Sequence, residues 1–94
     1  MTLKLVATTG NQTVTLPPGR QLLVGRSIAC DLPVRDPSVS RQHAELQIVS
    51  AGLEVNDLGS TNGTFSNGVR ITQTRLDPGM TVRFGSTEVR FWIG

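Results

Sequence analysis

The sequence has one cysteine, one histidine and one lysine in 94 residues. Cys30 has no partner for an internal disulfide, and with His43 it offers too few ligands for a zinc site. Lys4 belongs to no GxxxxGK[ST] pattern, so a Walker-type nucleotide loop is excluded. No apolar run is long enough to span a membrane, and none follows the N-terminus as in a signal peptide. We therefore expect a cytoplasmic protein with no metal, no cofactor and no membrane insertion.

The charge of the chain is nearly balanced. Lys+Arg number 9 and Asp+Glu number 7, giving a net charge of +2, which is too mild to indicate nucleic-acid binding. Four aromatic residues in the whole chain are also few for a base-stacking platform. All basic residues except Lys4 are arginines, whose planar guanidinium suits phosphate or carboxylate recognition. A general bias of the genome toward arginine codons explains this excess equally well.

Short apolar or alternating runs separated by turn signals predict strands and almost no helix. Residues 44–49 alternate with a period of two, which places Leu46 and Ile48 on one face. Turns recur about every 8–12 residues, a spacing typical of an all-β, antiparallel β-sandwich. The length suits one domain over residues 1–94, which we expect to be excised from a longer protein.

Particular turns and strands can also be predicted. Gly10-Asn11 is a turn-forming pair expected to close a first hairpin. The apolar residues 22–24 predict a central strand buried on both faces, and residues 31–34 a brief strand. The Asn-Gly pairs at 62–63 and 67–68 predict tight turns with positive φ on both sides of a very short strand.

Polar residues concentrate in three segments. These are Gly25-Arg26 after an apolar strand, residues 40–43 with the pattern SxxH, and residues 56–64 with the pattern STNGT. Each is weak evidence alone, but their order and spacing resemble those of a forkhead-associated (FHA) domain. The closing LxPGxxVxFG pattern of residues 76–85 extends this resemblance over nearly the whole chain.

The resemblance implies a sandwich of about eleven short strands that binds phosphothreonine peptides through loops at one end. By analogy with the family, Arg26 would pair with the phosphate, and the Ser40 hydroxyl would donate to a phosphate oxygen. Arg41 would add a basic side chain to the same group, and Thr61 would help to line the site. Asn62 would bond the peptide main chain beside the phosphothreonine.

Three further residues would shape these loops without touching the ligand: Gly25, His43 and Gly63. The chain departs from the family pattern at two places. Ser38 stands where some members have another basic residue, and Met80 follows Gly79 where aspartate is usual. In the family, the third residue after the phosphothreonine usually sets specificity. The candidate segments for recognising it are residues 35–37, 66–67 and 86–87.

These residues fit the chemistry of a phosphothreonine, which carries about −1.5 to −2 charge and three acceptor oxygens. We therefore expect a non-catalytic module that binds phosphothreonine-containing substrates of a Ser/Thr kinase and recruits its host protein to them. A phosphate-independent FHA-type scaffold or self-association domain is the alternative.

Other interpretations are open for single residues. Arg26 alone could be an ordinary surface ion-pair partner. Ser40, His43 and Asp57 could suggest a hydrolase triad, although Ser40 and His43 would tend to face opposite ways at the start of a strand. We expect instead that His43 packs in a loop with a ring nitrogen bonded to backbone. Asp57 is expected to bond its neighbouring turn.

Overall fold

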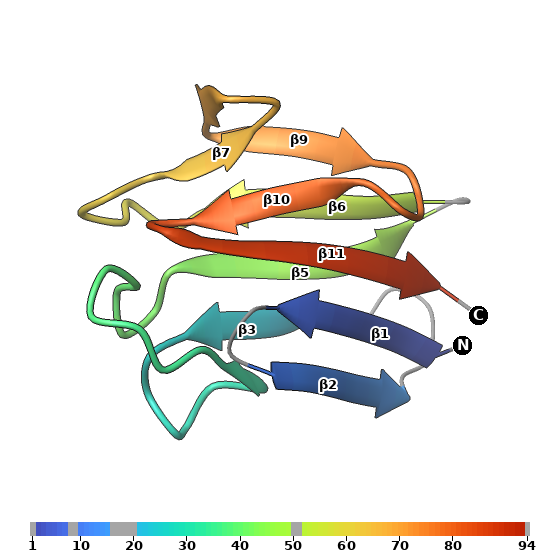
Figure 1. Ribbon diagram of the computed structural model, residues 1–94, viewed down its shortest axis with the longest axis horizontal. Coiled ribbons are helices and arrows are strands. Elements are labelled where there is room, and N and C mark those ends of the chain that lie inside the picture. Colours follow the sequence, from blue (N-terminus) through green and yellow to red (C-terminus); the bar gives the residue numbers. More distant parts are fainter. Residues whose placement is uncertain (1, 8–9, 16–20, 50–51, 94) are drawn as a thin grey trace.

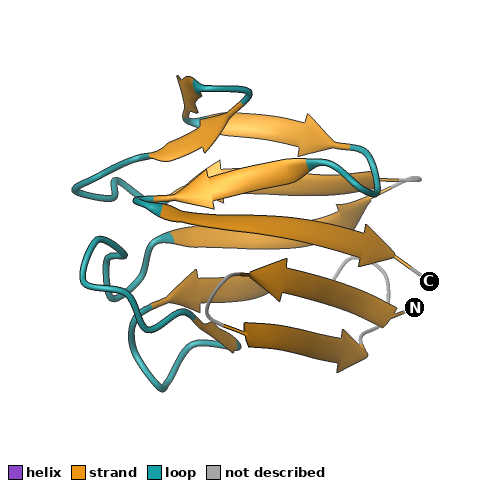
Figure 2. Cartoon of the chain, in the orientation of Figure 1, coloured by secondary structure: helices purple, strands orange, loops and turns teal. Residues whose placement is uncertain are grey.

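The computed structural model describes residues 2–7, 10–15, 21–49 and 52–93. Within these ranges the chain consists of strands and loops, with no helix that could cross a membrane (Figure 2). The strands in chain order are β1 (Thr2–Ala7), β2 (Gly10–Thr15), β3 (Gln21–Gly25), β4 (Leu32–Pro33), β5 (Ala44–Val49), β6 (Gly52–Asp57), β7 (Thr64–Ser66), β8 (Val69–Ile71), β9 (Gln73–Leu76), β10 (Thr81–Phe84) and β11 (Thr87–Ile93).

The strands form two sheets, as the prediction of a β-sandwich requires. The six-stranded sheet has the order β2-β1-β11-β10-β7-β8 and the five-stranded sheet the order β4-β3-β5-β6-β9 (Figure 1). The described strand pairs are antiparallel except β3 and β4, which pair in parallel with Val24 opposite Leu32. The fold class is therefore confirmed, with one short parallel pair at an edge.

The core lies between the inner faces of the two sheets. Strand β5 illustrates why the core forms there. Its apolar residues Ala44, Leu46 and Ile48 are buried on one face, and Glu45 and Gln47 are half-buried on the other. Removing this apolar surface from water stabilises the sandwich by about 25 cal/mol per Å². The buried apolar cluster contains Leu22, Val24, Leu32, Val34, Val39, Ala44, Leu46, Ile48, Leu53, Val55, Leu76, Val82, Phe84, Val89 and Phe91.

Two strand predictions were wrong in detail. Gly10 and Asn11 lie inside β2, opposite Ala7 and Val6, so this pair does not form the turn that the sequence predicts. Strand β3 is not central, because it lies between β4 and β5 near an edge. Its Leu23 is only half-buried, so β3 alternates instead of being buried on both faces.

The two Asn-Gly pairs behave differently. Asn67 and Gly68 both have positive φ, 51° and 76°, and join β7 to β8 with Ser66 opposite Val69. This is the two-residue hairpin turn that the sequence predicts. At the other pair only Gly63 has positive φ, 89°. The side chain of Asn62 instead donates to the Ser38 carbonyl in another loop. The Asn-Gly pattern therefore did not predict the φ of Asn62 correctly.

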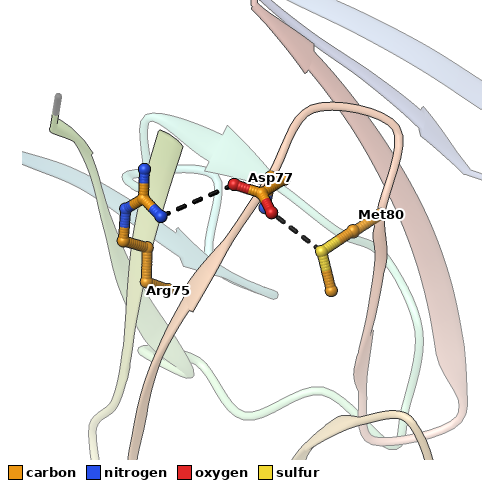
Figure 3. A network of polar contacts seen from close by, with 3 residues as sticks. All are labelled: Arg75, Asp77 and Met80. Carbon is orange, nitrogen blue, oxygen red and sulfur yellow. Dashed lines mark hydrogen bonds and ion pairs between the residues drawn. The ribbon is translucent and has the colours of Figure 1, made fainter. Parts of the chain in front are cut away.

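The turn between β9 and β10 explains the methionine at position 80. The backbone N–H of Asp77 donates to the sulfur of Met80 over 3.2 Å (Figure 3). The backbone N–H of Met80 donates in turn to the Asp77 carbonyl. Met80 also packs against the core, and Arg75 pairs with Asp77 at 3.5 Å. Met80 therefore stabilises this turn through its sulfur.

The polar segments singled out in the sequence lie together at one end of the sandwich. The β3–β4, β4–β5 and β6–β7 loops all project from the left end in Figure 1, whereas the start of β1 and the end of β11 lie at the right. The sheets thus present three loops on a common end.

Candidate functional site

Hydrogen bonds join the three loops to one another. The backbone N–H of Arg26 donates to the Ser40 carbonyl over 2.9 Å, which ties the β3–β4 loop to the β4–β5 loop. The N–H of Thr61 donates to Ser40 Oγ over 3.2 Å, and Asn62 Nδ2 donates to the Ser38 carbonyl over 2.9 Å. These two bonds tie the β6–β7 loop to the β4–β5 loop. The structure therefore brings together the five residues that the sequence placed at a ligand site.

His43 holds the loops from beneath. Its side chain is fully buried and meets Phe84 edge to face, with ring centroids 5.6 Å apart. Nδ1 accepts from the Ser40 N–H over 3.0 Å, which leaves Nε2 to donate to the Gly63 carbonyl over 2.9 Å. Burial lowers the pKa of His43, although the Gly63 carbonyl and the charge of Asp57 raise it. The neutral ring thus links two loops by backbone contacts, as expected.

This geometry does not build a hydrolase triad. Both ring nitrogens of His43 are engaged with backbone groups, so neither accepts from the Ser40 hydroxyl. Asp57 bonds its own turn, accepting from the N–H groups of Gly59 and Ser60 and from the hydroxyls of Ser60 and Thr64. A catalytic serine needs a base within hydrogen-bond reach, and His43 is not available for that role.

The carboxylate of Asp57 organises the loop that contains Thr61 and Asn62. Burial raises the pKa of Asp57, but the hydrogen bonds from Ser60, Thr64 and Gly59 outweigh that effect and lower the pKa overall. Ser60 Oγ also accepts from the Gly63 N–H over 3.1 Å. These bonds within the β6–β7 segment add to those that tie the loop to Ser40, Ser38 and His43.

Two glycines permit the close approach of these loops. A Cβ on Gly25 would lie 2.0 Å from the carbonyl oxygen of Arg41 and 3.0 Å from Cys30 Sγ, so no side chain fits. Gly63 has a φ of 89°, which L-residues rarely adopt. A Cβ there would also lie 2.9 Å from Arg70 Nε. At both positions a Cβ would meet neighbouring atoms, and a role in shaping a ligand site stays a prediction.

The hydroxyl of Ser40 is available as a donor. Its oxygen accepts from the Thr61 N–H, and its own proton takes part in no hydrogen bond within the described part of the chain. Asn62 uses one Nδ2 hydrogen for Ser38, which leaves a second hydrogen and Oδ1 for another group. Thr61 and Asn62 are exposed and Ser40 is half-buried. The loop end therefore presents oriented polar groups to solvent.

Two exposed arginines adjoin these donors. Arg26, Ser27 and Arg41 line an open depression of about 380 Å³. Neither arginine forms an ion pair with another described residue, so both guanidinium groups can meet an anion. Sequence reasoning missed Ser27, although its place directly after Arg26 could have pointed to it. No group of three or more potential metal ligands occurs among the described residues.

Sequence reasoning also missed the role of Ser38. Its Oγ donates to Asp36 Oδ1 over 2.6 Å and accepts from the Ser86 N–H over 2.8 Å. Hydrogen bonds from Ser38, above all from its side chain, lower the pKa of Asp36. Ser38 thus joins the β4–β5 loop to the β10–β11 turn, a contact between residues 48 positions apart that no local pattern contains.

Comparison with known proteins identifies the family. The FHA domain model matches residues 22–85. An ABC transporter ATP-binding/permease protein of Mycobacterium tuberculosis, Rv1747, is 37% identical over 85 residues, covering 90% of this chain. The FHA domain of CT664 from Chlamydia trachomatis has a TM-score of 0.87 at 27% identity, covering 100% of this chain and 99% of that one. The chain belongs to the FHA domain family.

A further similar structure comes from an analysis of phosphothreonine-dependent FHA domain interactions. It has a TM-score of 0.84 and 27% identity, and the match covers 100% of this chain and 98% of that one. The chain spans only 10%, 11% and 44% of the lengths of the first three curated relatives. It therefore corresponds to one part of those longer proteins.

Proposed function

We propose that this domain binds phosphothreonine-containing segments of partner proteins at the loop end of the sandwich. Arg26 and Arg41 neutralise the phosphate, the Ser40 hydroxyl donates to one of its oxygens, and Thr61 lines the site. Asn62 bonds the main chain of the bound segment. Gly25, His43 and Gly63 keep the loops in place.

One observation supports this proposal above all. Ser40 Oγ accepts from the Thr61 N–H, and the hydroxyl proton bonds no other described residue. The next residue, Arg41, lines an open depression with Arg26, and neither arginine forms an ion pair with another described residue. A charge-assisted hydrogen bond contributes about 1.5–3 kcal/mol. Two or three such bonds distinguish a phosphorylated from an unmodified segment by several powers of ten. The relation to FHA domains with phosphothreonine-dependent interactions supports the same ligand.

The proposal extends to the role of the domain in a longer host protein. The module is non-catalytic in this view, and it recruits its host to proteins phosphorylated by a Ser/Thr kinase. The much longer relatives are consistent with such a host. We place this module in the cytoplasm as part of the same proposal.

A peptide array tests the proposed function. The purified domain is probed against matched peptides that contain phosphothreonine, phosphoserine or unphosphorylated threonine. Binding confined to phosphothreonine is the expected result, and an Arg26→Ala domain on the same array should lose it. Equal binding to all three forms, unaffected by Arg26→Ala, would instead support the phosphate-independent scaffold.

A further inference from the structure

One cross-strand row on the outer face of the six-stranded sheet combines charge with an aromatic ring. The strand registers place Arg70 of β8 opposite Phe65 of β7, Phe65 opposite Arg83 of β10, and Arg83 opposite Glu88 of β11. Arg83 and Glu88 each lie between two buried residues along their strands. Because side chains alternate along a strand, this row faces away from the core. We call these four residues the outer row.

Arg83 is fixed within the outer row without being neutralised. Its guanidinium lies over the Phe65 ring, 4.2 Å from the ring centroid. Phe65, Arg83 and Glu88 line an open depression, yet no ion pair joins Arg83 to Glu88 within the described chain. A guanidinium stacked on a ring keeps its N–H donors at the edge of the plane, where they can meet a carboxylate in bidentate fashion.

The outer row begins beside the candidate phosphate site. A Cβ on Gly63 would lie 2.9 Å from Arg70 Nε and 3.0 Å from a Phe65 ring carbon, so both side chains approach Gly63 closely. Gly63 directly follows Asn62. Arg70 also donates through Nη2 to the Ser60 carbonyl over 3.3 Å. The surface is therefore continuous from the β6–β7 loop onto the sheet.

The charge on this surface indicates what it binds. Two residues of the row, Arg70 and Arg83, are positively charged, and one, Glu88, is negatively charged. Arg90 also faces outward, on β11 opposite Thr81. Within the row, Arg70 and Phe65 are the residues that approach Gly63, Arg83 follows them, and Glu88 lies at the other end. An acidic side chain is therefore complementary to Arg70 and Arg83, and Glu88 repels a carboxylate farther along the row.

We propose that the outer row binds an acidic residue in the same segment that carries the phosphothreonine, through Arg83 with support from Arg70. This rests on the proposed function. The row crosses three strand spacings, about 14 Å, and an extended chain advances about 3.3 Å per residue. A segment held by its phosphate needs only a few flanking residues to reach the row. The surface thus selects among phosphothreonine segments by charge.

Fluorescence anisotropy with labelled phosphothreonine peptides tests the inference. Asp and Asn are compared at each flanking position in turn, in both chain directions from the phosphothreonine. The wild-type domain should bind the Asp form about threefold to tenfold more tightly at one or two positions. A change in affinity of this size lies between the contribution of an exposed ion pair and that of a charge-assisted hydrogen bond. Arg83→Gln should abolish this preference and keep the phosphate dependence.

Other variants sharpen the test. Glu88→Gln should strengthen binding of the Asp form, since it removes a like charge, and Arg83→Lys should retain part of the preference. Arg75→Gln is the matched control, because it removes the same charge from the other sheet and should change nothing. Thermal melting of each variant confirms that it is folded.

The outcomes separate the two proposals. Phosphate-dependent binding with no positional preference for Asp, or with a preference that survives Arg83→Gln, overturns the role of the outer row. A folded wild-type domain that binds none of the peptides in a phosphate-dependent way overturns the proposed function instead, and this inference with it.

Discussion

The backbone N–H of Ser40 donates to Nδ1 of His43, three residues further along the chain. The same ring reaches the Gly63 carbonyl through Nε2, so a single buried side chain sets the distance between the two loops. Ser40 then accepts from Thr61 with its hydroxyl oxygen. The orientation of the candidate phosphate donor thus depends on a residue that does not reach the surface.

This linkage predicts that acid destabilises the domain through His43. Its folded-state pKa lies below that of the unfolded chain, so the unfolded state binds the proton more readily. Stability from the neutral ring is therefore complete above about pH 6.5 and declines as the pH falls toward the folded-state pKa. Urea unfolding at pH 5 and pH 7.5 measures this. The His43→Phe variant has no imidazole to protonate, so its free energy of unfolding should differ less between pH 5 and pH 7.5 than that of the wild type.

Arg26→Ala should weaken binding of a phosphothreonine peptide by about 2–5 kcal/mol, the cost of breaking a charge-paired, hydrogen-bonded contact. Isothermal titration calorimetry measures the loss. Arg26 is exposed, so the circular dichroism spectrum should not change. Affinity close to that of the wild type would show that the phosphate binds elsewhere.

Ser40→Ala should have a smaller effect, about 1–3 kcal/mol on peptide binding. The variant loses the donor to phosphate and also the acceptor for the Thr61 N–H. Ser40→Thr, which restores a hydroxyl, is the matched comparison and should recover part of the affinity. An effect of Ser40→Ala that is equal for phosphorylated and unphosphorylated peptides would contradict a contact with phosphate.

Asp57→Asn should lower the free energy of unfolding by about 1–3 kcal/mol at pH 7, because the carboxylate accepts four hydrogen bonds from its turn. The pKa of Asp57 is lowered in the folded state, so its stabilisation is present above about pH 3.9 and is lost as the pH falls through the folded-state value. The difference between variant and wild type in urea should therefore shrink in acid. A difference independent of pH would show that the charge is not responsible.

Gly25→Ala should destabilise the fold by about 1–3 kcal/mol, as overpacking does in a close-packed interior. The new Cβ would meet the Arg41 carbonyl, which must move, and peptide binding should weaken with it. Thermal melting measures the first effect and calorimetry the second. A variant as stable as the wild type would show that the two loops have room to separate.

Several features of this protein could be predicted from the sequence because their causes are local. Period-two alternation in residues 44–49 produces a strand with one buried face, and Asn67-Gly68 forms a hairpin turn wherever it joins two short strands. The order of the GR, SxxH and STNGT segments identified the family. Asp57 bonds residues within seven positions of itself, so its role as the organiser of a turn was also predictable.

Other features depend on contacts between distant parts of the chain. The turn-forming pair Gly10-Asn11 became part of β2, because pairing with β1 fixes the register of that hairpin. Ser38 meets Ser86 and Asn62 only because the sandwich brings the β4–β5 loop, the β6–β7 loop and the β10–β11 turn together. The outer row likewise exists only because β10 pairs with β7, which joins the β7–β8 hairpin to the β10–β11 hairpin. The sequence by itself determined the strands, the family and the loop residues, since these follow from local periodicity and motif order. The tertiary structure alone decided which loops meet and which charges have no ion-pair partner among the described residues, because these depend on how the strands pair and the sheets pack.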